Sequence, residues 1–252
     1  MARGATFDLR LFLDRLLTRS VLTPEEQDAI LALPFQVIHI ERKRDFVHLN
    51  EEVTYSCFIA SGLVARYGQT MDGKRQITAF HIAGDMADLH SAVRSVGVGG
   101  LNALSDSVIL RIPHVAIRTL TARYPAVAEA FWRDCMLDTA ILMQWVINVG
   151  RRNSLGRLAH IFCEMSVRSG RDREVLLAFD MAVTQEQLGD AAALTSVHVN
   201  RSLKALSGMV TLKSGHVRIA DWDRLARLGE FDATYLIADT GRDRQRRALT
   251  SA

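Results

Sequence analysis

Few of the features that define small secreted or membrane proteins occur in this sequence. Only 3 of the 252 residues are cysteines, and they lie far apart, at Cys57, Cys135 and Cys163. This spacing argues against a disulfide framework and favours a reducing, cytoplasmic setting. No uninterrupted apolar run follows Arg3, and no window approaches the roughly 18 apolar residues of a membrane span. We therefore expect neither a signal peptide nor a transmembrane helix.

The residues needed for common catalytic and metal sites are also missing. An iron–sulfur cluster needs about four clustered cysteines, which three isolated ones cannot supply. The chain has no nucleophile elbow, no phosphate-binding glycine loop and no His-x-His pair. None of the histidines that could ligate haem has partner spacing: His39, His48, His81, His90 and His114. We expect no enzyme and no resident cofactor, with a cupin-like metalloenzyme as the weaker alternative.

The composition is that of a globular protein with room for two domains. Hydrophobic residues make up 48% of the chain and charged residues 23%, as in ordinary globular proteins. The formal net charge of +3 permits nucleic acid binding without requiring it. The class of partner must therefore come from local sequence patterns.

The most informative stretch runs from residue 183 to residue 220. Thr184, with Gln187 three residues later, forms a capping box that begins a short helix. A break of three residues, Ala193 to Thr195, follows, and Thr195 can cap a second helix. The two helices and their short connection predict a helix-turn-helix.

The second of these helices has two distinct faces. Three aliphatic residues spaced i, i+4 and i+7 share an inward face: Val199, Leu203 and Leu206. The outward face carries one aliphatic, one amide and two cationic side chains: Val197, Asn200, Arg201 and Lys204. Strands at 210–213 and 216–219 then flank the turn Ser214-Gly215. The outward face suits the major groove of DNA, and the whole stretch predicts a winged helix-turn-helix.

The N-terminal part of the chain changes character near Pro34. Before it, an amphipathic stripe and a capping box at Thr23 predict two helices; the stripe consists of Leu9, Phe12, Leu13, Leu16 and Leu17. From Phe35 to Ile112, short runs of β-forming residues alternate with turn signals such as Asp72-Gly73. This pattern predicts a small antiparallel sandwich or jelly roll.

A long helix is predicted from about Ala126 to Val149, with one apolar seam that includes Val127, Phe131, Met136, Ile141 and Trp145. Its roughly 24 residues at 1.5 Å each would span about 36 Å, and it carries two apolar stripes instead of one. We expect it to pair with its twin in a homodimer; the alternative is a helix packed only on its own domain. The segment from Gly150 to Asn153 interrupts the pattern and is interpreted as a hinge.

Three segments together resemble the cyclic-AMP-receptor-protein and FNR (CRP/FNR) family of bacterial transcription regulators. They are FHIAGDMADLH (80–90), GRRNSLGRLAHIFCEM (150–165) and TQEQLGDAAALTSVHVNRSL (184–203). They look most like an alphaproteobacterial subgroup of undefined effector. The resemblance implies an α+β fold with an antiparallel β-roll, a long dimerisation helix and a C-terminal winged helix-turn-helix.

The resemblance also implies the partners and the domain boundaries. We expect a sensor domain at 1–125, the dimerisation helix at 126–150, the DNA-binding domain at 151–236 and a disordered tail at 237–252. The homodimer would bind a near-palindromic operator in double-stranded DNA, with half-sites roughly 34 Å apart, and would act with RNA polymerase. Operator, regulated genes and the sign of regulation are not encoded in any pattern we can read.

Residue by residue, the family's base-reading positions fall on Ser196, Val197, Asn200 and Arg201. Arg201 matches the family's arginine and can contact guanine in a bidentate manner. Where many members carry a glutamate that reads cytosine, this chain has Val197, so its half-site should differ. Thr184 and Gln185 match phosphate-holding positions, and further phosphate contacts are expected from His198, Lys204, Lys213 and His216. Ala193 stands where the family's turn usually has glycine.

The expected effector pocket departs further from the family. Cyclic-nucleotide binders use a glutamate for the ribose and an arginine for the phosphate. These positions correspond to Leu89 and Gly97 here, so cyclic AMP should not bind in the familiar way. The candidate pocket residues are Asp88, Leu89, His90, Ser91 and Arg94, of which Arg94 could supply a cation. A cyclic-nucleotide-responsive activator with a non-standard pocket, or a regulator without any small effector, remains an alternative.

Overall fold

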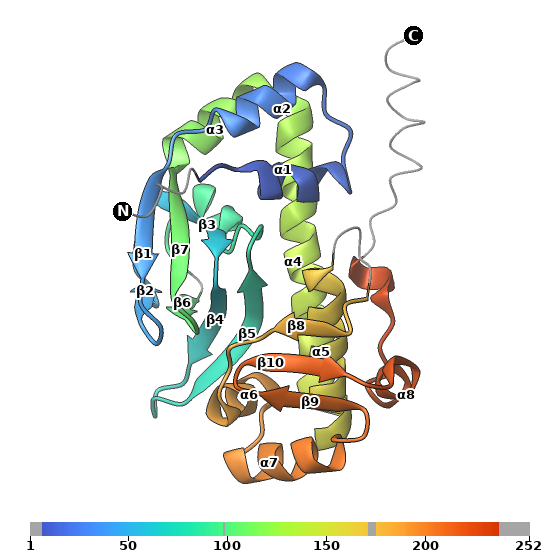
Figure 1. Ribbon diagram of the computed structural model, residues 1–252. Helices are drawn as coiled ribbons and strands as arrows, with labels where there is room; N and C mark the ends of the chain where they lie inside the picture. The colour runs from blue at the N-terminus through green and yellow to red at the C-terminus, as the bar shows by residue number, and fades with distance from the viewer. Residues whose placement is uncertain (1–6, 98, 171–174, 237–252) are drawn as a thin grey trace, which may run out of the picture. The chain divides into compact units, whose positions relative to one another are not determined.

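The computed structural model describes residues 7–97, 99–170 and 175–236 (Figure 1). The predicted disordered tail at 237–252 lies outside the described residues. The chain divides into two compact units: the described residues up to 64 together with 81–138, and residues 65–80 together with 139–236. The predicted α+β class is confirmed: two short helices come first, then the strands, a long helix, and finally a helical domain with a small sheet.

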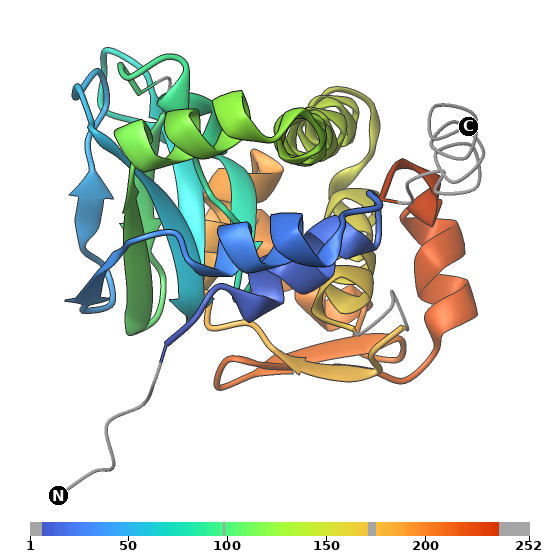
Figure 2. The same cartoon turned by 90° about the horizontal axis from the view of Figure 1, so that it is seen from above.

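The first unit combines a β-roll with helices at both of its ends. Its helices are α1 (Arg10–Leu17), α2 (Pro24–Leu31), the 3-10 helix η1 (Leu89–Ala92), α3 (His114–Arg123) and the start of α4 (Pro125–Arg151). The roll strands are β1 (Gln36–Ile40), β2 (Asp45–Val47), β3 (Tyr55–Ser61), β4 (Leu63–Gln69), β5 (Arg75–Ile82), β6 (Gly100–Ala103) and β7 (Ser107–Pro113). Most of β4 and β5, residues 65–80, is assigned to the second unit. Figure 2 shows α4 nearly end-on, with α3 (green) and the blue helices α1 and α2 as separate layers beside it.

The strands form two antiparallel sheets, as the alternation of short strands and turns predicted. One sheet has the order β1-β7-β3 and the other β2-β6-β4-β5. In the first sheet Val37 faces Leu110, and Leu110 also faces Phe58 of β3. The central strand β7 is therefore covered on both edges, which fixes its register.

Two apolar clusters hold this unit together, one on each face of β7. Ile109 belongs to the cluster inside the roll, whereas Leu110 belongs to the cluster under the helices. The alternation follows from the two-residue period of a strand. In the helical cluster the ring of Phe12 lies 6.1 Å from that of Phe58 and 5.5 Å from that of Phe131. This aromatic contact joins α1, β3 and α4.

The N-terminal helices form largely as the sequence predicted. The capping box of Thr23 and Glu26 is present at the start of α2. In α1, Phe12, Leu13 and Leu16 are buried, but Leu17 is 36% exposed. Leu17 is therefore not part of the buried stripe, because 100° per residue carries it past the edge of the packed face.

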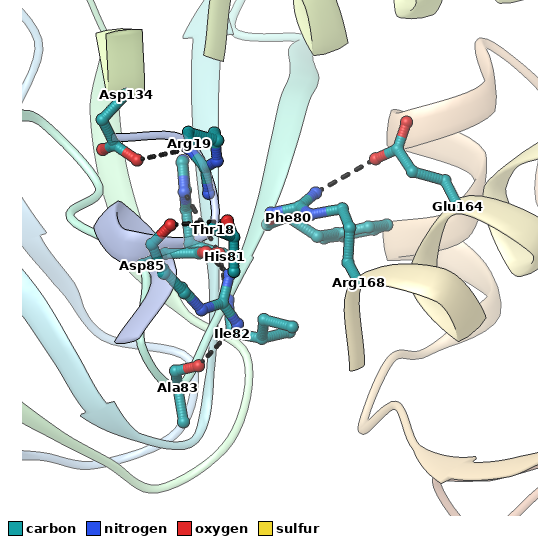
Figure 3. Close-up of polar contacts among 11 residues, drawn as sticks. Thr18, Arg19, Phe80, His81, Ile82, Ala83, Asp85, Asp134, Glu164 and Arg168 are labelled. Atoms are coloured by element: carbon teal, nitrogen blue, oxygen red, sulfur yellow. Dashed lines mark hydrogen bonds and ion pairs between the residues drawn. The ribbon is translucent and has the colours of Figure 1, made fainter. Parts of the chain in front are cut away.

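Charged side chains of α1 and its following loop bind the roll and α4. Arg15 forms an ion pair with Asp85 and donates to the carbonyl oxygen of Ala83 at 2.8 Å. Gly84 has φ +95°, and a Cβ there would lie 2.5 Å from Arg15 Nε, so only glycine fits this turn. Arg19 Nη1 lies 3.0 Å from Asp134 Oδ1 (Figure 3).

Helix α4 runs unbroken from Pro125 to Arg151, so the helix ends after Gly150 and not at it. The seam predicted for this helix divides between two faces. Its residues Val127, Phe131, Ile141 and Trp145 are buried, whereas Met136 is 59% exposed. Grouping Met136 with the buried stripe was wrong, because a helix with two apolar stripes gives ambiguous periodicity.

The second unit contains a helix-turn-helix with a three-stranded wing sheet. Its elements after α4 are α5 (Ser154–Ser169), β8 (Ala178–Asp180), α6 (Gln185–Ala192), α7 (Ser196–Ala205), β9 (Val210–Lys213), β10 (His216–Ile219), α8 (Trp222–Leu228) and the 3-10 helix η3 (Ala233–Leu236). The sheet has the order β8-β10-β9. The predicted hairpin strands are found with the predicted bounds, and β8 is an additional strand.

A buried ionic network supports α5, the helix on which the helix-turn-helix packs. Glu164 is fully buried, and its Oε1 lies 3.0 Å from Arg168 Nη1 (Figure 3). Glu164 Oε2 also accepts from Trp145 Nε1 at 3.1 Å and from the Tyr235 hydroxyl at 2.8 Å. These four groups join α4, α5 and η3, and the buried charge is compensated at each oxygen.

None of the helices in the described parts of the chain is both long enough and apolar enough to span a membrane.

Candidate DNA interface and effector site

The turn between α6 and α7 begins and ends at capped helices. Thr184 Oγ1 accepts from the backbone N–H of Gln187, and the Gln187 side chain accepts from the backbone N–H of Thr184. This is the predicted capping box. Thr195 Oγ1 caps α7 by accepting from the backbone N–H of His198. Between the helices Ala193 has φ 52° and ψ 49°, the left-handed conformation that favours glycine.

Two further residues hold this turn. A Cβ on Gly189 would lie 2.5 Å from the carbonyl oxygen of Leu194, so the turn can approach α6 only at glycine. Arg157 of α5 donates from Nη1 to the carbonyl oxygens of Ala192 at 2.9 Å and of Ala193 at 3.3 Å. It thereby bonds carbonyl groups that the end of α6 leaves without helical partners. No local sequence pattern pointed to this role for Arg157.

The residues predicted to contact DNA lie at the surface of the second unit. Apart from Asn200, which is half-buried, all are exposed: Thr184, Gln185, Ser196, Val197, His198, Arg201, Lys204, Lys213 and His216. On the opposite side of the helix Val199 and Leu206 are completely buried, and Leu203 is half-buried. The predicted division into an inward and an outward face is therefore confirmed.

Short side-chain contacts orient part of this face. Asn200 Nδ2 donates to Gln185 Oε1 at 3.3 Å, which joins the outward side of the second helix to the start of the first. Thr195 Oγ1 lies 2.8 Å from His198 Nδ1. Arg201 has no ion-pair partner among the described residues, so its guanidinium donors are available to another molecule.

The wing places two basic residues on either side of a tight turn. Ser214 and Gly215 have φ of 50° and 80°, the two positive values that a two-residue hairpin turn of this type needs. Lys213 and His216 face each other across it, and both are exposed. His216 Nδ1 also pairs with Asp180 of β8. The wing turn therefore presents one lysine and one histidine to solvent.

The residues of the predicted effector pocket do not share one environment. Asp88 is buried, and its Oδ1 accepts from the backbone N–H of Cys57. Leu89 is 6% exposed and packs in the apolar cluster under the helices. His90 is half-buried and Arg94 is exposed.

Ser91 belongs to a buried chain of hydrogen bonds. Its Oγ lies 2.8 Å from His114 Nε2 and 3.1 Å from Ser56 Oγ. Burial lowers the pKa of His114, and the nearby charge of Arg118 lowers it further, although a hydrogen bond with the backbone of Tyr55 opposes both. His114 is therefore favoured in its neutral form, and the polar groups on this side of η1 are engaged with one another.

One cation of the β-roll was not singled out in the sequence. Arg111 lies on β7 at the register of Cys57, and its guanidinium carbon is 4.2 Å from the centre of the Tyr55 ring. This is a cation–π contact. Only the pairing of distant strands brings these residues together, so no spacing in the sequence could have found it.

Two family models match the two halves of this arrangement. A model described as a cyclic nucleotide-binding domain matches residues 37–124. A model described as a Crp-like helix-turn-helix domain matches residues 156–228.

Curated relatives match most of the chain at low identity. The fumarate and nitrate reduction regulatory protein of Shigella dysenteriae is 24% identical over 191 residues, which cover 75% of this chain and 76% of that protein. The regulatory protein HlyX of Actinobacillus pleuropneumoniae is 23% identical over 188 residues, covering 74% and 78%.

Solved structures share the fold. FixK2 from Bradyrhizobium japonicum has a TM-score of 0.71 and 21% identity, covering 80% of this chain and 100% of its own. TTHB099 from Thermus thermophilus, a CRP-family transcriptional regulator, has a TM-score of 0.61 and 16% identity, covering 77% and 97%. The two family models, the curated relatives and the capped helix-turn-helix identify the chain as a DNA-binding transcription regulator of the CRP/FNR family.

Proposed function

We propose that the protein works as a homodimer that binds a near-palindromic operator through the outward face of α7. The observation that carries this proposal is the exposed, capped α7, on which Arg201 stands without an ion-pair partner among the described residues. Arg201 would read guanine through two hydrogen bonds, and Val197, which is 68% exposed, would contact a thymine methyl group. Ser196 and Asn200 complete the base-reading set.

The remaining candidate residues would position the protein on the DNA backbone. Thr184 and Gln185 at the start of α6 would contact phosphates, and further contacts would come from His198, Lys204, Lys213 and His216. Such a regulator acts in the cytoplasm, where it meets the promoter and RNA polymerase.

The homodimer rests on the exposed face of α4. Residues 132, 136, 139, 143 and 146 repeat with spacings of four and three, the heptad pattern of paired helices. Of these, Trp132 is 74% exposed, Met136 59%, Met143 62% and Val146 61%. Apolar side chains in this number are costly in water, and pairing two copies of α4 would cover them.

The effector is proposed to be something other than a cyclic nucleotide held in the family's usual way. Leu89, at the family's ribose-binding position, packs in an apolar cluster, and Asp88 beside it is bonded to the backbone of Cys57. The residues present therefore do not fit that ligand. The membership of the alphaproteobacterial subgroup likewise stays a prediction.

A selection of bound sequences from a random DNA pool tests the DNA-binding proposal. The wild-type chain should enrich a two-fold symmetric site with half-site centres about one helical turn apart. Enrichment of an asymmetric site, or of none, would contradict it.

Sedimentation of the variant Met143→Glu tests the dimer. A charge on the exposed face of α4 should shift the protein to a monomer, whereas Glu at Met71, which is fully exposed in the β4–β5 turn, should not. Calorimetric titration with cyclic AMP should show no binding at micromolar concentration; saturable binding would overturn the proposal about the effector.

A further inference from the structure

A cleft of about 1300 Å³ lies in the first unit, outside the β-roll. It is lined by the connection between α1 and α2, by η1, by α3 and by the first turns of α4. Its apolar wall includes Leu89, Ile117, Phe131 and Trp132. The cleft is large enough for a small organic ligand, and its mainly apolar wall is typical of ligand pockets.

The short helix η1 separates the cleft from the polar groups described above. Ser91 and the preceding Asp88 are bonded to Ser56, His114 and the backbone of Cys57. The rest of this turn, Leu89, His90, Ala92 and Val93, lines the cleft. The side of η1 that could still receive a ligand is therefore the side facing the cleft.

Two large apolar side chains at the cleft are exposed to water. Val93 is 94% exposed and Trp132 is 74% exposed. Single exposed apolar residues are common, but these two line the same concave surface. A ligand with an apolar body would gain from covering them.

The polar groups of the cleft favour one negative charge on the ligand. Arg118 donates from Nη1 to the carbonyl oxygen of Ala92 at 3.0 Å, which holds its guanidinium beside η1, and no carboxylate pairs with it in the described residues. Arg133, the other cleft arginine, is already paired with Glu129 at 2.7 Å. Ser20 is 7% exposed, lines the cleft, and its hydroxyl has no hydrogen-bond partner among the residues described.

We propose that this cleft binds an organic monocarboxylate with an apolar body, whose carboxylate meets Arg118 and whose body covers Val93 and Trp132. A guanidinium matches a carboxylate in its planar geometry. A doubly charged phosphate ester fits less well, because one unpaired arginine would face it together with the carboxylates of Glu26 and Glu129. The role of this ligand as the effector rests on the proposed function. Trp132 belongs both to the cleft and to the α4 face assigned to the dimer, so a ligand that contacts it would affect that pairing.

Calorimetric titration of the full chain with decanoate and 2-naphthoate tests binding directly, without DNA. At least one of the two acids should bind with a one-to-one stoichiometry, and decanol, which lacks the charge, should bind at least tenfold more weakly than decanoate. No saturable binding of either acid at up to millimolar concentration would overturn the proposal.

Two pairs of variants locate the bound anion. Arg118→Gln should weaken binding at least tenfold, whereas Arg123→Gln, on the same helix but outside the lining, should leave it within about twofold. Val93→Glu should weaken binding more than Val93→Lys: both changes remove the exposed apolar side chain, but only glutamate also repels the carboxylate. Equal affinities of wild type, Arg118→Gln and Val93→Glu would overturn the assignment.

The effector role of the bound acid is tested by a separate measurement. With the acid bound, the dimer dissociation constant from sedimentation, or the affinity for the selected operator, should change at least threefold. In Arg118→Gln the acid should change neither quantity. Binding without either change would overturn the effector role but not the DNA-binding proposal. Failure of the random-pool selection would contradict the DNA-binding proposal while leaving the calorimetric result intact.

Discussion

On α7 the candidate residues lie in solvent, whereas on and beside η1 most of them are enclosed. Arg201 is exposed and has no ion-pair partner within the described residues; Asp88 is buried and bonded to a backbone N–H. A DNA reader needs side chains that can leave water for base edges, so its functional face follows from the periodicity of one capped helix. A pocket is formed by several segments that are distant in the sequence, and polar residues in it also make hydrogen bonds that stabilise the fold.

The largest loss of stability is expected from changes in the buried network around Glu164, which supports the helix-turn-helix. Glu164→Ala removes the carboxylate that Arg168, Trp145 and Tyr235 share, and leaves the arginine buried without its partner. It should lower the free energy of unfolding by about 3–5 kcal/mol, measured by urea titration. Glu186→Ala, on the exposed first turn of α6, should change it by less than about 1 kcal/mol. Equal losses would show that the buried network does not stabilise the unit.

Acid should weaken the second unit through His160. This fully buried side chain stacks with Tyr235, and burial, with a smaller contribution from the charge of Arg152, lowers its pKa to about 4. Between pH 6.5 and pH 4, His160 therefore binds a proton in the unfolded chain but stays neutral in the folded chain. Stability present above pH 6.5 should be lost as the pH falls toward 4, by roughly 3 kcal/mol in total.

His160→Gln should flatten this dependence of the free energy of unfolding on pH. Asp134, in the first unit, has the opposite sign: burial raises its pKa to about 6, with the Arg19 charge opposing, so its protonation favours the folded state as the pH falls through that value. Asp134→Asn should remove that gain. An unchanged pH profile in either variant would contradict the assignment of the titrating group.

Removal of a buried candidate residue should change stability more than that of an exposed one. Asp88→Ala leaves the backbone N–H of Cys57 buried without its acceptor, at a cost of about 1–3 kcal/mol. Arg94→Ala, in the same predicted pocket but exposed, should cost less than about 0.5 kcal/mol. Thermal unfolding measures the stability of both variants. An Asp88→Ala protein as stable as wild type would contradict the structural role assigned to Asp88.

The smallest effect concerns the turn between α6 and α7. Ala193→Gly should raise the free energy of unfolding by up to about 1 kcal/mol, because Ala193 holds a left-handed conformation that glycine adopts without strain. The same substitution at Ala205, the last residue of α7, should lower it by about 0.5–1 kcal/mol. Effects of the same sign at both positions would contradict the strain at Ala193.

The parts that the sequence predicted well are those determined by neighbours in the chain. Thr184 and Gln187 form their capping box within four residues, and the wing turn needs only Ser214 and Gly215. Propensity and spacing are sufficient at this range.

The parts that escaped prediction depend on contacts between distant segments. Arg157 reaches carbonyl groups more than 30 residues away, and Asp88 bonds Cys57 from another strand connection. The exposed position of Met136 depends on which stripe of α4 the rest of the unit covers. Spacing in one segment cannot decide such choices, since either stripe could face the core.

Arg201 is proposed to read the operator from an exposed position in which it has no structural role. Binding of the selected operator and of all its single-base variants by wild type and Arg201→Ala tests it most directly, with Arg224→Ala on α8 as the control. Arg201→Ala should lose about 1–3 kcal/mol of DNA-binding free energy and the preference at one base pair per half-site, while its thermal unfolding stays unchanged. An unchanged sequence preference, or a loss spread evenly over all positions, would contradict it.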